Sequence, residues 1–160
     1  MQGKIFGIKG KLSRPAAFGI YVILIVEDDP KEAEKGIKAV KEKGCVCSSA
    51  SLTAPIGAVS TLEELREHLD HPKVVWDGVI TDLYLTDEPV GLAVAAECKS
   101  RGIPCVICTD RYRHAESQWW YKVAEELGAE VEVRKDWNAA VEKLIALIEK
   151  KKALLVEKKE

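Results

Sequence analysis

The chain has 160 residues, of which 47% are hydrophobic and 31% charged, and its formal net charge is -2. This composition suits one globular domain with a single core, and the balanced charge provides no bulk attraction to nucleic acid or an acidic membrane. The five cysteines lie mostly in apolar runs, which fits a reducing compartment, and the longest apolar run, residues 20–26, is too short to span a bilayer. We therefore expect a cytoplasmic protein that works through a local site.

The first segment, residues 1–19, is basic and interrupted by glycines. This composition is typical of a solvated extension or a small added hairpin, and we assign it no function. We expect the folded domain to occupy residues 20–150. The remaining residues, 151–160, are predicted to form a charged end of the last helix.

Five segments have the character of β-strands. Tyr21–Val26, Val74–Leu85 and Pro104–Cys108 are apolar and rich in β-branched residues, which is typical of strands buried on both faces of a parallel sheet. Cys45–Cys47 and Glu130–Arg134 are weaker or alternate polar with apolar residues, as strands at sheet edges do.

A helix is predicted after each strand from its caps and its apolar stripe. Pro30 suits the first turn of the first helix, and either Trp119 or Trp120 should face the core from the fourth. The predicted caps and stops are Asp29 and Gly44 for the first helix, Ser60 for the second, Gly102 for the third, Gly128 for the fourth, and Asp136 or Asn138 for the start of the fifth.

Strands that alternate with helices predict a parallel sheet covered on both faces, with right-handed crossovers. The strand order 2-1-3-4-5 buries the three apolar strands and leaves the two weaker ones at the edges. We therefore predict a flavodoxin-like, doubly wound α/β fold with a five-stranded parallel sheet.

Polar side chains follow four of these strands. Glu27 and Asp28 come after the first strand, Asp82 ends the apolar part of the third, and Thr109 and Lys135 follow the fourth and fifth. The carboxyl ends of parallel strands share one edge of the sheet, so these side chains should converge. Three carboxylates in one place repel one another unless a cation such as Mg²⁺ is present, and lysine and threonine suit a phosphoryl group. The nucleophilic member of the group would be Asp82, forming an aspartyl phosphate.

These strand ends resemble the receiver domain of two-component response regulators. The segment ILIVEDDP, residues 23–30, is similar to the family's acidic-pair strand, and DGVITDLYL, residues 77–85, to its phosphoacceptor strand. IPCVICTD, residues 103–110, and LGAEVEVRK, residues 127–135, are similar to the threonine and lysine strands. The resemblance extends from residue 21 to about residue 150.

The resemblance implies a stand-alone phosphoacceptor signalling protein rather than an enzyme. A sensor histidine kinase or a phosphotransfer protein would phosphorylate it, and it would act on a downstream protein or form a homodimer through its fourth helix, fifth strand and fifth helix. No nucleic-acid or membrane partner is expected. By resemblance, the phosphoacceptor is Asp82, the residues that contact the phosphoryl group are Thr109 and Lys135, and the Mg²⁺ ligands are Glu27, Asp28, Asp82 and the backbone carbonyl of Tyr84.

Several residues depart from the family pattern. Thr86 and Asp136 stand where proline is usual, Asp110 adds a negative charge after the threonine, and Glu132 replaces the aromatic switch residue. Because a glutamate on an edge strand should prefer water, we expect any output to run through the loop of residues 110–114 and the helix after it.

Two other functions remain compatible with the residues. One is a pseudo-receiver that binds proteins without being phosphorylated, which Asp110, Glu132 and Asp136 favour. The other is a magnesium-dependent phosphatase with an aspartyl phosphate. The phosphatase is disfavoured because Tyr84 occupies the position, two residues after Asp82, where a second acid would be needed.

Overall fold

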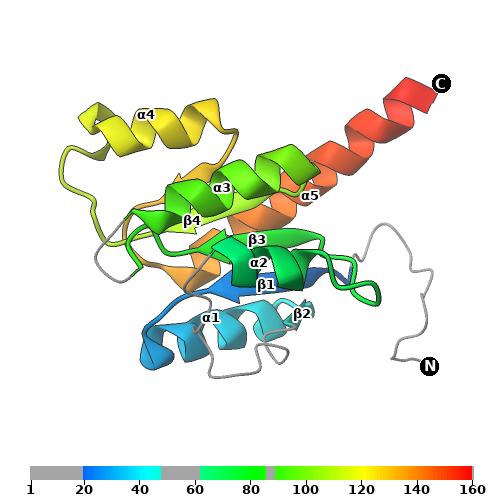
Figure 1. The fold of residues 1–160 in the computed structure, drawn as a ribbon, viewed down its shortest axis with the longest axis horizontal. Coiled ribbons are helices and arrows are strands. Elements are labelled where there is room, and N and C mark those ends of the chain that lie inside the picture. Colours follow the sequence, from blue (N-terminus) through cyan, green and yellow to red (C-terminus); the bar gives the residue numbers. More distant parts are fainter. Residues whose placement is uncertain (1–19, 48–61, 86–88, 160) are drawn as a thin grey trace.

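The computed structural model describes residues 20–47, 62–85 and 89–159, and its centre is a five-stranded, all-parallel sheet. The strand order is β2-β1-β3-β4-β5 (Figure 1), so the predicted order and the flavodoxin-like fold are confirmed. The strands are β1 (Val22–Val26), β2 (Val46–Cys47), β3 (Gly78–Thr81), β4 (Cys105–Cys108) and β5 (Glu130–Glu132).

Helices cover both faces of the sheet (Figure 1). Helices α1 and α5 pack on one face, and α2, α3 and α4 pack on the other. Their bounds are Pro30–Glu42 for α1, Leu62–Leu69 for α2, Val90–Arg101 for α3, Trp119–Glu126 for α4 and Trp137–Lys159 for α5. The basic extension at residues 1–19, the Ser60 cap and the Thr86 departure lie outside the described residues.

Strand β1, which lies between β2 and β3, contributes to the hydrophobic cores on both faces. Ile23 and Ile25 pack with α1 and α5, whereas Leu24 and Val26 pack with the helices of the opposite face. This division follows from the alternation of side chains along a strand. The first polar side chain after this apolar run is Glu27, which therefore follows a strand whose last four residues are buried.

The helix ends follow the local sequence signals. The side chain of Asp29 caps α1 by accepting a backbone N–H at 2.9 Å, and Pro30 occupies the first turn. Asp136 caps α5 by accepting a backbone N–H at 3.1 Å, whereas Asn138 lies inside the helix. Gly102 ends α3 in the left-handed conformation, with φ of 69°. The predicted signals at the start of α1, the end of α3 and the start of α5 are therefore confirmed.

Strand β3 is much shorter than the prediction of Val74–Leu85, which was wrong in extent. Pairing with β1 covers Gly78–Thr81. Trp76 turns toward α2, where its indole N–H donates to the carbonyl of His68 at 2.7 Å. The Asp77 carboxylate accepts the backbone N–H that begins β1, at 2.8 Å. Outside the strand, Trp76, Leu83 and Leu85 are buried in the core with residues of α2 and α3, whereas Val75 is 80% exposed.

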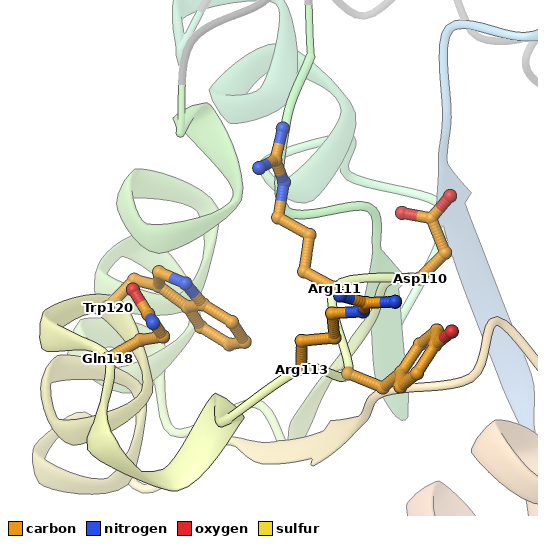
Figure 2. A pocket seen from close by; sticks show the side chains of 6 residues that line it. Asp110, Arg111, Arg113, Gln118 and Trp120 are labelled. Carbon is orange, nitrogen blue, oxygen red and sulfur yellow. The ribbon is translucent and has the colours of Figure 1, made fainter.

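The loop between β4 and α4 borders a surface cavity of about 320 Å³. Figure 2 shows Arg111 and Arg113 on the loop side of this cavity, with Gln118 and Trp120 on the side of α4. The tryptophan that faces the core is Trp120, with 3% of its surface exposed, whereas Trp119 is 57% exposed.

Helix α5 continues past the body of the domain to Lys159, and its last turns project from the fold (Figure 1). Residues 151–158 are exposed there. Within the described ranges, none of the helices combines the length and the apolar character that crossing a membrane requires.

Gly91, in the first turn of α3, packs against the backbone that carries Asp82. A Cβ at this position would lie 2.2 Å from the carbonyl oxygen of Asp82 and 2.8 Å from the Cα of Leu83. We predict that Gly91→Ala lowers the free energy of unfolding by about 1–3 kcal/mol, although the same change in an ordinary helix raises it by about 1 kcal/mol. Urea denaturation measures the difference, and Ala96→Gly on the exposed side of α3 gives the propensity effect alone. A more stable Gly91→Ala protein would contradict this packing.

Candidate functional site

An open cavity of about 430 Å³ lies at the carboxyl edge of the sheet. All six residues singled out from the sequence as site residues line it, so the structure brings them together. Four of the five strands contribute through the loops that follow them. The lining residues are Glu27, Asp28, Asp29, Glu32, Asp82, Tyr84, Thr109, Asp110, Arg111 and Lys135.

Backbone hydrogen bonds continue the sheet into these loops and fix the positions of the site residues. The N–H of Asp82 donates to the carbonyl of the last residue of β1 at 3.0 Å, which places it beside Glu27. The N–H of Thr109 donates to the carbonyl of the last residue of β5, and the N–H of Lys135 donates to the carbonyl of Thr109, both at 2.8 Å. The hydrogen-bonded sheet therefore holds the site residues in fixed positions.

Three acids gather their carboxylate oxygens in a small volume. One oxygen each from Glu27, Asp28 and Asp82 lies within 4.8 Å of the other two. Glu27 is 2% exposed, Asp82 is half-buried and Asp28 is exposed. The three carboxylates are thus shielded from solvent on the side of Glu27 and open to solvent on the side of Asp28.

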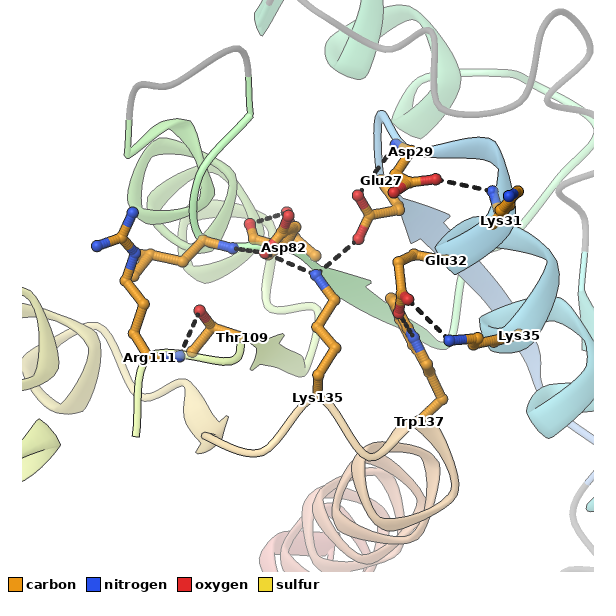
Figure 3. Close-up of polar contacts among 12 residues, drawn as sticks. Glu27, Asp29, Lys31, Glu32, Lys35, Asp82, Thr109, Arg111, Lys135 and Trp137 are labelled. Carbon is orange, nitrogen blue, oxygen red and sulfur yellow. Dashed lines mark hydrogen bonds and ion pairs between the residues drawn. The ribbon is translucent and has the colours of Figure 1, made fainter. Parts of the chain in front are cut away.

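The ammonium of Lys135 lies between the two less exposed acids (Figure 3). Its Nζ is 2.9 Å from Oε1 of Glu27 and 3.0 Å from Oδ1 of Asp82. The other oxygen of Glu27 accepts the backbone N–H of Asp29 at 3.1 Å, and Oδ1 of Asp82 accepts the backbone N–H of Leu83 at 2.8 Å. The side chain of Lys135 therefore links the residue that follows β1 to the residue that follows β3.

Burial and mutual repulsion oppose the ionisation of both acids. Burial, followed by the charge of Asp82, raises the pKa of Glu27 to about 7, against the opposing effect of Lys135. Burial also raises the pKa of Asp82, although Lys135 opposes this shift. For Lys135 itself, burial disfavours the ammonium, but the contacts with Glu27 and Asp82 outweigh burial and raise its pKa above the ordinary value. The lysine is thus a permanent positive charge, and Glu27 carries a proton for part of the neutral pH range.

The donor set fits a hard divalent cation. Carboxylate oxygens are the ligands that such ions prefer, and one open side leaves room for water or a phosphoryl oxygen. Oε1 of Glu27 is shielded from solvent, and among the described residues no group donates a well-directed hydrogen bond to it, although it forms the ion pair with Lys135. Because a carboxylate oxygen has more than one lone pair, Oε1 can contact a metal ion in addition to the Lys135 ammonium.

Thr109 and Arg111 form the side of the cavity at the end of β4. Thr109 is 2% exposed, and its Oγ1 accepts the backbone N–H of Arg111 at 3.4 Å. The guanidinium of Arg111 lies over the ring of Tyr84, 3.9 Å from the ring centroid. Sequence reasoning missed this pair because the two residues belong to separate loops and share no motif.

Helix α1 supplies a further acid that was not predicted. Glu32 lines the cavity, and its Oε1 accepts the indole N–H of Trp137 at 2.9 Å (Figure 3). The same carboxylate pairs with Lys35 at 2.9 Å. The hydrogen bond from Trp137 is the largest cause of the lowered pKa of Glu32, so this acid is ionised beside the site. An acid in the first turn of a helix is common because it interacts favourably with the helix dipole. The position of Glu32 in the sequence therefore did not indicate that it lines the cavity.

The expectation that Glu132 prefers water was wrong. Its side chain is 7% exposed, and its Oε1 pairs with Nζ of Lys143 at 3.2 Å. A long side chain from α5 thus covers this edge of the sheet and provides the countercharge that a buried carboxylate needs. Of the other departures, Asp136 has a local role as the cap of α5, and Asp110 is exposed at the rim of the cavity.

Comparison with protein-family models gives no match for this chain, and comparison with curated proteins gives none either. The resemblance to receiver domains therefore depends on the strand-end residues, now placed in one cavity, and on the fold. Any function inferred from them is a proposal.

The raised pKa of Glu27 generates a prediction about metal binding. Because a protonated carboxyl group is a poor ligand, Mg²⁺ affinity should fall as the pH is lowered through about 7. Isothermal titration calorimetry at a series of pH values measures this dependence. Glu27→Gln should bind weakly, with a flat profile over the same range. A wild-type affinity that does not change between pH values on either side of 7 would contradict the assignment.

Proposed function

We propose that this protein is a stand-alone receiver domain in which Asp82 accepts a phosphoryl group with the help of Mg²⁺. The observation that carries the proposal is the position of Lys135 Nζ, 2.9 Å from Glu27 and 3.0 Å from Asp82, in a cavity that also contains the carboxylate of Asp28. A nucleophilic carboxylate, a fixed cation and additional oxygen ligands are the components that phosphoryl transfer to an acid requires.

In the proposed reaction, a carboxylate oxygen of Asp82 attacks phosphorus. The new O–P bond forms as the bond between phosphorus and the leaving atom of the donor breaks, and the bonding electrons leave with that atom. The ammonium of Lys135 exchanges its contact with Asp82 for a phosphoryl oxygen and offsets the charge that develops there. The hydroxyl of Thr109 donates its proton in a hydrogen bond to another phosphoryl oxygen. A bound Mg²⁺ would supply further positive charge on the side of Glu27 and Asp28.

The proposed role is signalling rather than catalysis of a metabolic reaction. The donor would be a sensor histidine kinase or a phosphotransfer protein, and the phosphorylated form would bind a downstream protein or a second copy. The loop of residues 110–114 supports a route to such a surface. Asp110 and Arg111 line both the acidic cavity and the neighbouring cavity beside α4, so a charge added to Asp82 acts on a loop that contacts both.

A protein-binding module that acts without phosphorylation is the second candidate, and one observation favours it. Lys135 already compensates Glu27 and Asp82, and a proton on Glu27, whose pKa is about 7, can relieve the remaining repulsion. The three carboxylates can therefore coexist near neutral pH without a metal ion.

Incubation with a small-molecule phosphodonor and Mg²⁺ should produce a single acid-labile phosphoryl adduct on Asp82, detected by intact mass spectrometry. The adduct should be absent from Asp82→Asn and from samples that contain a metal chelator. Lys135→Ala should form it about 100-fold more slowly, because a charge that stabilises the transition state is lost.

Asp110→Asn is the matched control for this experiment, since Asp110 lines the same cavity but lies outside the group of three acids. It should still form the adduct. A wild-type protein that binds Mg²⁺ but stays unmodified would refute phosphorylation and favour the protein-binding module.

A further inference from the structure

Glu132, the last residue of β5, makes contacts that converge on the loop carrying Lys135. Its Oε2 accepts the backbone N–H of Arg134 at 2.9 Å and the backbone N–H of Asp136 at 3.4 Å. These two N–H groups lie on either side of Lys135. One buried carboxylate oxygen thus holds the backbone both before and after the lysine.

The backbone of Lys135 needs such a restraint. Its φ is +57°, in the left-handed region, which residues with a Cβ seldom adopt. Its own N–H donates to the carbonyl of Thr109 at 2.8 Å, which secures one point of the loop. The contacts from Glu132 secure the two neighbouring points, so three hydrogen bonds oppose the relaxation of this residue to an extended conformation.

The second oxygen of Glu132 is held from α5. Nζ of Lys143 lies 3.2 Å from Oε1 of Glu132 and donates to the carbonyl of Val131 at 3.1 Å. Because Lys143 fixes this end of the carboxylate, the other oxygen stays directed at the loop. The arrangement connects α5, the end of β5 and the backbone of Lys135.

We propose that Glu132 is a positioning residue for Lys135, holding the loop after β5 in the conformation that places the lysine ammonium between Glu27 and Asp82. This inference rests on the proposed function, in which that ammonium stabilises the transferred phosphoryl group. Glu132 touches neither substrate nor metal and acts only through the lysine. An aromatic residue at this position could not accept hydrogen bonds from the loop in this way.

Glu132→Gln tests the proposal with little change in volume. A glutamine has one acceptor oxygen, so it cannot accept from the loop and from Lys143 at the same time. We expect adduct formation on Asp82 to slow about tenfold, as when a supporting residue of a reactive group is lost. Mg²⁺ affinity should not weaken, because Lys135 is not a ligand. Glu130→Gln, an exposed acid on the same strand, should match the wild type in both measurements.

A double-mutant cycle with Lys135→Ala separates positioning from general damage to the fold. In the Lys135→Ala background, Glu132→Gln should cause no further loss of rate, because its effect passes through the lysine. A wild-type rate in Glu132→Gln, a parallel loss of Mg²⁺ affinity, or an additional loss in the Lys135→Ala background would overturn the proposal.

A second measurement does not require phosphorylation. NMR spectroscopy of the Lys135 ammonium in metal-free protein should show proton exchange that is slow in the wild type and in Glu130→Gln but faster in Glu132→Gln. Unchanged exchange in Glu132→Gln would refute positioning. Faster exchange together with no adduct on the wild type would support positioning while the proposed function fails.

Discussion

The ion pairs of Lys135 with Glu27 and Asp82 are the interaction on which the site depends. Six acids and two basic residues line the cavity, so its charge is strongly unbalanced. Lys135 is the basic residue placed between the buried Glu27 and the half-buried Asp82, at 2.9 and 3.0 Å from their oxygens. Without it, burial and repulsion would push the pKa values of both acids still higher. The sheet edge can carry several acids because this lysine reaches them from the far edge strand.

The remaining charge imbalance connects the two candidate functions. A proton on Glu27, whose pKa is about 7, and a divalent cation are alternative ways of relieving the same repulsion. In the phosphoacceptor proposal, the cation replaces the proton, and Lys135 is free to contact a phosphoryl oxygen. In the protein-binding proposal, the proton and the lysine are sufficient. The functions therefore differ in which positive charge the cavity takes up.

Sequence reasoning placed the fold and the strand-end residues because both depend on local patterns. Apolar strands, helix caps such as Asp29 and the convergence of strand ends in a parallel sheet are all visible along the chain. Contacts between distant segments were missed. The burial of Glu132 depends on Lys143 reaching over the sheet edge from α5, and Arg111 over Tyr84 joins two loops. The start of the third strand was misjudged because Trp76, which precedes it, is buried against α2 rather than in the sheet.

The most direct measurement of the central claim is fluorine NMR spectroscopy with Mg²⁺ and beryllofluoride, a tetrahedral mimic of a phosphoryl group on a carboxylate. If Asp82 is a phosphoacceptor supported by Lys135, the wild type should show a bound fluoride signal that requires Mg²⁺ and disappears in Asp82→Asn. The absence of a bound signal at saturating Mg²⁺, or a signal that persists in Asp82→Asn, would contradict the account.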